Sequence, residues 1–322
     1  MPKKVVVIGG GTGTFTVLSG LKKYPFNLTA IVTMSDDGSS SGVLRDELGV
    51  LPPGDVRQCL VALSRSPQFL RELMNYRFRE GGLRGHSFGN LFISALEKMT
   101  GSFDEAVTRA SEVLHIEGRV IPSTLNKVRL AAKFSDGKIV RGEDKLAHTN
   151  LHGMQKLFLV PRALANPKAL RAIAEADAIV IGPGNLFRSL VPNLLARGIP
   201  EAIRKSHGKK IFVANLMTQE GHTDGFTLGE YIKTIEQYLG GPMEYVIWNK
   251  KMPPAALLKR YARKGEHLVP RGEIVSGHRY IGGNLVSEKI FRPQKWDPIS
   301  AHRTLIRHDP ARLGALIAKL VA

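Results

Sequence analysis

The sequence predicts an α/β protein, with a three-layer, doubly wound and mainly parallel sheet covered by helices on both faces. Two observations support this prediction. Strand and helix patterns alternate along nearly all of the 322 residues, as in chains whose parallel strands are joined by crossover helices. Several strand patterns are continuous runs of branched apolar residues, such as VVVI at positions 5–8. Such runs are typical of strands that are covered on both faces.

The expected strands are short apolar runs followed by glycine or polar residues: Lys4–Ile8, Leu28–Met34, Lys127–Phe134, Leu157–Val160, Ala178–Ile181, Lys210–Ala214 and Tyr245–Trp248. The expected helices have apolar residues three and four positions apart. They include Phe15–Lys23, Asp55–Leu63, Pro67–Phe78, Leu91–Met99, Phe103–Leu114, Pro167–Ala176, Leu186–Arg197, Leu228–Leu239, Pro254–Lys264 and Pro310–Leu320. Three of these helices begin with a proline after a capping residue, which is Ser66, Asn166 or Asp309.

The alternation predicts a single domain over residues 1–322. Residues from about 119 to 161 interrupt it with short strands and turns, and Asp136-Gly137 is typical of a hairpin. We therefore expect a small β-rich insertion between two α/β halves, not a separate domain.

Composition limits the function classes. The chain has one cysteine, Cys59, which excludes an intrachain disulfide framework and a multi-thiolate zinc site. No apolar run reaches the roughly 18 residues of a membrane span, and no signal peptide is expected, so a cytoplasmic location is predicted. The net charge is +18 and is spread along the chain. It indicates either a solvated basic surface or attraction to a polyanion.

The first expected strand ends in a glycine-rich turn, GGGTGTF at positions 9–15. It completes neither the dinucleotide fingerprint nor a P-loop, which requires a lysine. The backbone amides of Gly10, Gly11 and Gly13 can still hold an anion at a helix N-terminus, with the hydroxyls of Thr12 and Thr14 as further donors. The alternative is a tight strand-to-helix turn without a ligand.

The second expected strand ends in SDDGSSSGVLR at positions 35–45. Asp36 and Asp37 could hold sugar hydroxyls or a divalent cation at the edge of the sheet where ligands bind. Ser41 belongs to a donor-rich turn, and Arg45 can reach back to an anion. The alternative is a solvated Asx-turn with a serine cap.

Further polar loops follow the same pattern. Asp55 and Arg57 open one helix, and Asn90 lies at the glycine-rich entry to another. Gly184 and Asn185 form a second phosphate-like turn after a strand. One more polar loop leaves the strand that ends at Ala214, and it carries Asn215, Thr218, Gln219, Glu220, His222 and Asp224. His86, His222 and His308 are candidate bases, although an ordinary loop histidine is the default interpretation of each.

Six motifs, in order, resemble the YvcK-type gluconeogenesis factors of the CofD-like superfamily: GGGTGTF, SDDGSSSGVLR, PPGDVR, HSFGNL, GPGNLFRSLVPNLL and NLMTQEGHTDGF. The resemblance covers nearly the whole chain. It implies a Rossmann-like, three-layer fold that binds UDP-N-acetylglucosamine in the cytoplasm. It also implies a role in central carbon metabolism, cell shape and cell-wall synthesis, with no established reaction. The protein is therefore expected to be a non-catalytic regulator that requires no cofactor. Its regulatory protein partner is not identified by the sequence, and a homodimer is possible.

When the functional residues of the family are matched to this sequence, the resemblance implies that Gly10 to Thr14 cradle a diphosphate. It places Asp36 and Asp37 near the sugar or a cation. Further ligand contacts are implied at Asn185, Asn193 and Asn215, and a counter-charge at Arg263, unless that residue belongs to a solvated helix face. The sequence departs from the family pattern at Asn185, where a small hydroxyl residue is expected, at Glu220 and at His222-Thr223.

Two other functions remain open at this point. One is a CofD-type transfer of a phospho-lactyl group from a nucleotide diphosphate donor, which would use Mg²⁺ held by Asp36 and Asp37. The other is a nucleic-acid-binding module, which only the net charge favours. Because the chain lacks a basic stretch interleaved with aromatic residues, nucleic acid is not expected as a partner.

Overall fold

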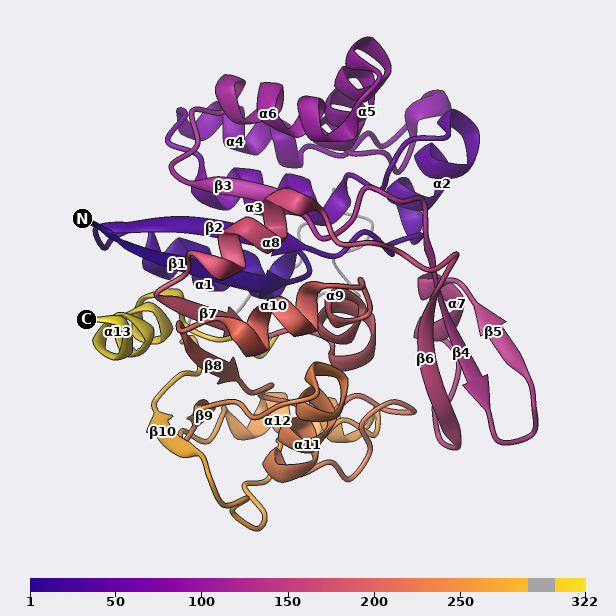
Figure 1. The fold of residues 1–322 in the computed structure, drawn as a ribbon. Helices are drawn as coiled ribbons and strands as arrows, with labels where there is room; N and C mark the ends of the chain where they lie inside the picture. Colours follow the sequence, from indigo (N-terminus) through magenta and orange to yellow (C-terminus); the bar gives the residue numbers. More distant parts are fainter. Residues whose placement is uncertain (289–304) are drawn as a thin grey trace.

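The computed structural model describes residues 1–288 and 305–322. A seven-stranded parallel sheet forms the centre, in the order β10-β9-β8-β7-β1-β2-β3, with helices on both faces (Figure 1). The predicted fold class is confirmed. The strands of this sheet are β1 (Lys3–Gly9), β2 (Phe26–Val32), β3 (Arg119–Pro122), β7 (Ala178–Ile181), β8 (Lys209–Val213), β9 (Tyr245–Asn249) and β10 (Arg279–Gly283).

The helices come between the strands, as crossover connections require. They are α1 (Thr12–Leu21), α2 (Ser39–Leu48), α3 (Gly54–Leu63), α4 (Gln68–Asn75), α5 (Phe88–Thr100), α6 (Phe103–Val113), α7 (Glu143–Ala147), α8 (Pro167–Ala174), α9 (Val191–Leu194), α10 (Ile199–Lys205), α11 (Leu228–Leu239), α12 (Ala255–Ala262) and α13 (Pro310–Val321). Two short segments, η1 (Gly81–Leu83) and the π-helical η2 (Leu186–Leu190), complete the set. Within the described ranges, no helix is long and apolar enough to cross a bilayer.

The sheet separates two apolar cores. On β1, Val5 and Val7 face a core shared with α1, α3, α5, α6 and α13. Val6 and Ile8 face the other core, which α8, α10 and α11 close. The alternation follows from the two-residue period of a strand. It explains why a continuous apolar run was needed at this position.

The direction of the connections reverses beside β1. The chain builds β2 and β3 on one side of β1 and then adds β7, β8, β9 and β10 on the other. β1 and β7 are paired in parallel from Val5 and Ala178 to Ile8 and Ile181. Their carboxyl ends therefore lie at the same level. Ligands of open α/β sheets bind at such a switch point.

A second sheet of three antiparallel strands, β5-β4-β6, projects from the body (Figure 1). It comprises β4 (Arg129–Phe134), β5 (Ile139–Arg141) and β6 (Met154–Val160). The hairpin predicted at Asp136-Gly137 is confirmed by the β4–β5 pairing. One boundary of the predicted insertion is wrong: β3 pairs with β2 at the edge of the large sheet. The insertion therefore begins after Pro122.

Other differences have local causes. The predicted helix Leu186–Arg197 is divided into η2 and α9 because Pro192 has no N–H to continue an α-helical ladder. The SSSG turn is the first turn of α2, which was not predicted. Ser66 does not cap α4, whereas Asn166 and Asp309 cap α8 and α13 as expected.

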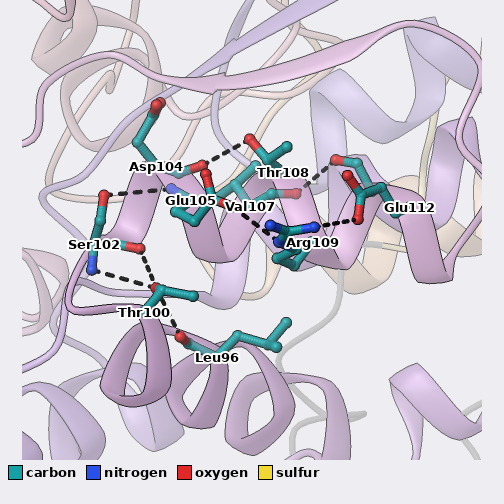
Figure 2. Close-up of polar contacts among 10 residues, drawn as sticks. Leu96, Thr100, Ser102, Asp104, Glu105, Val107, Thr108, Arg109 and Glu112 are labelled. Carbon is teal, nitrogen blue, oxygen red and sulfur yellow. Dashed lines mark hydrogen bonds and ion pairs between the residues drawn. The ribbon is translucent and has the colours of Figure 1, made fainter.

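The α5–α6 junction illustrates how local polar contacts set the helix ends (Figure 2). The side chain of Ser102 accepts the N–H of Glu105 and caps α6, while the hydroxyl of Thr100 donates to the carbonyl of Leu96 at the end of α5. Arg109 then pairs with Glu105 and Glu112 along the exposed face of α6. The opposite, apolar face of α6 is buried in the core against the sheet.

Candidate functional site

A cleft of about 450 Å³ lies at the carboxyl ends of β1, β7 and β8. Three loops converge there, from residues 10–13, 183–189 and 215–219, together with residues of α3, α12 and the segment before α13. Because β1 and β7 flank the switch point, the two glycine turns lie next to each other. A volume of this size is within the usual range of small-molecule sites, about 300–1,000 Å³.

The first glycine turn brings the N-terminus of α1 to the cleft. Gly11 is the N-cap of α1, and the helix begins at Thr12. The first amides of any α-helix have no partner within the helix, so those of Thr12 and Gly13 suit an anion. Gly13 also lies against the second turn: a Cβ on Gly13 would be 1.8 Å from the carbonyl oxygen of Pro183. Glycine is therefore required where the two turns touch.

Part of the first turn is occupied by the chain itself. The backbone N–H of Gly11 is hydrogen-bonded to the carboxyl group of Asp55 at the start of α3. The hydroxyl of Thr12 donates to Oε1 of Gln58 at 3.0 Å. An anion in the cleft would therefore bind to the amides of Thr12 and Gly13, because the amide of Gly11 is already hydrogen-bonded to Asp55.

The second glycine turn carries the polar side chains of the opposite wall. Oδ1 of Asn185 accepts the N–H of Arg188 at 2.9 Å and so caps η2. Nδ2 of Asn185 donates to Gln219 in the loop after β8. This bond joins two walls of the cleft.

The third wall includes α12 and the segment before α13. The hydroxyl of Tyr261 accepts the N–H groups of Leu305, at 2.7 Å, and of Ile306. This contact places Arg307 and His308 at the cleft. Burial lowers the pKa of His308 to about 4, although a hydrogen bond to the backbone of Ala214 opposes this effect. His308 is therefore neutral at pH 7.

Three residues that line the cleft have a buried polar atom without a hydrogen-bond partner among the described residues. These atoms are Nε of Arg188, Oδ1 of Asn215 and Nε2 of His308. Buried polar atoms in proteins are nearly always paired, with protein, water or a ligand. The three residues line the cleft, but the unpaired atoms themselves are enclosed by the protein.

Carboxyl groups lie around Arg188. Asp55 lines the cleft, whereas Asp36 and Glu143 lie beside it. Nη1 of Arg188 contacts Oε1 of Glu143 at 2.6 Å, and both side chains are mostly buried. Burial raises the pKa of Glu143 to about 7, Arg188 opposes the rise, and Asp36 adds to it. Burial, together with the charges of Asp36 and Glu143, also raises the pKa of Asp55.

The structure brings seven of the fifteen predicted site residues together at the cleft: Gly10, Gly11, Thr12, Gly13, Gly184, Asn185 and Asn215. Thr14 and Asn193 lie behind the first turn. The hydroxyl of Thr14 points toward Gly9 and is fully buried. Nδ2 of Asn193 donates to the carbonyl oxygens of Gly9 and Ser189. Asn193 therefore joins the first turn to η2.

Asp36 and Asp37 lie beside the cleft and do not line it. Asp37 accepts Nη1 of Arg129 at 3.0 Å and the N–H of Asp144 at 2.8 Å, so it joins β2 to the insertion. Asp36 accepts the N–H of Gly38 at 3.1 Å. Among the described residues, no group of three or more His, Cys, Asp or Glu side chains could hold a metal ion.

The remaining predicted residues are also outside the lining. Nδ2 of Asn90 donates to Ser40 and its Oδ1 accepts Nε of Arg57, which joins α5 to α2 and α3. Ser41 and Arg45 lie on α2, where Ser41 contacts Asp36. Arg263 is exposed at the end of α12.

The sequence reasoning missed several residues of the cleft: Ser189, Tyr261, Glu266 and Arg307. Arg188 was missed as well, although it lies four positions after Gly184, within the GPGNLFRSLVPNLL motif. Tyr261 and Arg307 come from segments without a glycine turn, so no local signal marked them.

Comparisons with known proteins agree with this architecture. A family model described as "2-phospho-L-lactate transferase CofD" matches residues 5–285. A "Gluconeogenesis factor" of Halalkalibacterium halodurans is 45% identical over 320 residues, which cover 98% of this chain and 95% of that protein. The chain belongs to the CofD-like gluconeogenesis factor family.

Other relatives place the whole chain in the gluconeogenesis factor family. The "Gluconeogenesis factor" of Bacillus subtilis is 36% identical over 99% of this chain and 98% of its own length. A crystal structure of a UPF0052 family member from Bacillus halodurans has a TM-score of 0.88 and 36% identity, and the match covers 99% of each chain. The family predicted from the six motifs is confirmed.

Proposed function

We propose that the cleft binds a nucleoside diphosphate sugar, UDP-N-acetylglucosamine, and that the protein is a cytoplasmic regulator of central carbon metabolism, cell shape and cell-wall synthesis without turnover. One observation carries the proposal: two glycine turns at the switch point and the N-terminus of α1 line the same cleft of about 450 Å³. Backbone amides at a helix N-terminus are a general phosphate site.

The charges around the cleft are compatible with a diphosphate. Arg188 and Arg307 line it. Asp55 lies close to the amides that a phosphate would use, but its raised pKa means that it carries less negative charge than an exposed carboxylate at the same pH. Asn215 and His308 also line the cleft with polar side chains that suit a sugar or a base.

Calorimetric titration of the purified protein with UDP-N-acetylglucosamine, GDP and a short DNA duplex tests the proposal. We expect heat with the UDP-sugar, with a Kd on the order of micromolar, and none with GDP or the duplex. Absence of UDP-sugar binding contradicts the proposal. Duplex binding that weakens steeply with salt would instead support nucleic-acid recognition.

A phospho-group transfer reaction is the second candidate. Its support is the CofD family match, the carboxyl group of Asp55 in the lining of the cleft, and those of Asp36 and Glu143 beside it. In such reactions a protein mainly positions charged groups and neutralises them. Preference for GDP over the UDP-sugar, together with dependence on added Mg²⁺, would favour this candidate.

A further inference from the structure

A second hollow, of about 860 Å³, lies away from the cleft, between the small sheet and the residues that follow α9. It is lined by residues 156–164 of β6 and the following turn, by Lys133 of β4, and by Leu195 and Arg197 after α9. We call it the β6 groove. It shares no lining residue with the cleft.

The β6 groove has an apolar floor and a basic rim. Leu157 and Leu159 are buried in its floor, and Leu164 remains 63% exposed. Lys133, Lys156, Arg162 and Arg197 line it and are exposed. No Asp or Glu is among the lining residues, and within residues 1–288 and 305–322 none of the four cations has an ion-pair partner. Clustered cations without counter-charges repel one another. An acidic molecule bound in the groove would reduce this repulsion.

The groove follows an edge strand. β6 pairs with β4 on one side, and no strand of residues 1–288 or 305–322 pairs with its other side, although Leu164 beyond its end forms an isolated bridge with Arg197. Tyr238 of α11 hydrogen-bonds the backbone of Leu157, so the body covers part of this edge. An extended chain laid along β6 would place alternate side chains toward the apolar floor and toward the cations.

We propose that the β6 groove docks an extended, acidic segment of a partner protein, with apolar side chains at alternate positions. The basic rim and the apolar residues of the groove distinguish this partner from two other molecules that could bind there. A second copy of this chain carries a net charge of +18 and would be repelled by the basic rim. A nucleic acid backbone would satisfy the cations but would leave the exposed side chain of Leu164 uncovered.

Selection from a displayed library of short random peptides tests this inference. The bait is the full chain, and the counter-bait is Lys156→Glu/Arg197→Glu. The control Lys23→Glu/Lys233→Glu has the same net charge, because it reverses two exposed lysines outside the groove that have no ion pair among the described residues. We expect clones enriched in alternating acidic and apolar residues, with about tenfold weaker binding to the groove variant and unchanged binding to the control.

Leu164→Ser should also weaken these clones, whereas Met99→Ser, at a residue that is 80% exposed elsewhere, should not. The inference is overturned if the groove variant retains the same clones, if the selected clones show no acidic preference, or if the library gives no clone specific for the wild type. Groove-dependent binding of anionic phospholipid vesicles or single-stranded DNA, in place of the peptides, would also overturn it.

Discussion

Gly13→Ala is expected to lower the free energy of unfolding by about 2–4 kcal/mol. The new Cβ would be 1.8 Å from the carbonyl oxygen of Pro183 and 2.7 Å from its carbonyl carbon. Both atoms are backbone, so the two glycine turns must separate to relieve the clash. Because the proposed diphosphate site is built from these turns, UDP-N-acetylglucosamine binding should weaken by at least about tenfold. Urea unfolding and calorimetry measure the two effects.

Gly82→Ala is the matched control. A Cβ on Gly82 meets no atom within 4 Å. The free energy of unfolding should stay within about 0.5 kcal/mol of wild type, with unchanged UDP-sugar binding. If Gly13→Ala unfolds at the same urea concentration as Gly82→Ala, the two turns do not meet as described.

Arg188→Gln is expected to destabilise the protein by about 2–4 kcal/mol at pH 8. The change leaves Glu143 buried near Asp36 without its cation, whose Nη1 is 2.6 Å from Oε1 of Glu143. UDP-sugar binding should also weaken, because Arg188 lines the cleft. Urea unfolding measured from pH 5 to pH 8 checks the effect on stability.

The pH dependence has a definite sign. Burial raises the pKa of Glu143 in the folded protein from 4.5 to about 7. Between these values the folded state binds more protons than the unfolded state, so the contribution of Glu143 to stability falls as pH rises and levels off above pH 7. Without Arg188 the pKa of Glu143 rises further, and the free energy of unfolding therefore continues to fall at higher pH. The destabilisation by Arg188→Gln should therefore be small at pH 5 and grow toward pH 8.

Glu143→Gln/Arg188→Gln is the control for this effect. Because this variant has no carboxyl group at position 143, its destabilisation should be the same at pH 5 and at pH 8. If Arg188→Gln shows the same destabilisation at pH 5 and pH 8, the charge of Glu143 does not cause it.

The parts of the fold that the sequence predicted are those with strong local patterns. The apolar run before Gly9 predicted β1, and the glycines after it predicted the turn that opens α1. β10 was missed because its sequence, RYIGG, is short and ends in glycines, and its residues are only partly buried. β3 was assigned to the insertion because only pairing with β2 identifies it as a strand of the large sheet.

The candidate site was predictable where glycine turns mark the ends of strands. Asp37, Asn90 and Asn193 carry polar side chains in suitable motifs, but their bonds go to other parts of the chain. Those partners are distant in sequence, so local reasoning could not separate a ligand contact from a structural one. Arg188, in contrast, lines the cleft but was not predicted. Its partner Glu143 is 45 residues away, and only the fold brings the two side chains together.

A crystal structure of the protein with UDP-N-acetylglucosamine tests the central claim most directly. The account predicts that the diphosphate lies between the two glycine turns, with its oxygens about 3 Å from the amide nitrogens of Thr12 and Gly13. Density for the ligand outside the cleft, or a diphosphate that makes no contact with the first turn, would contradict it.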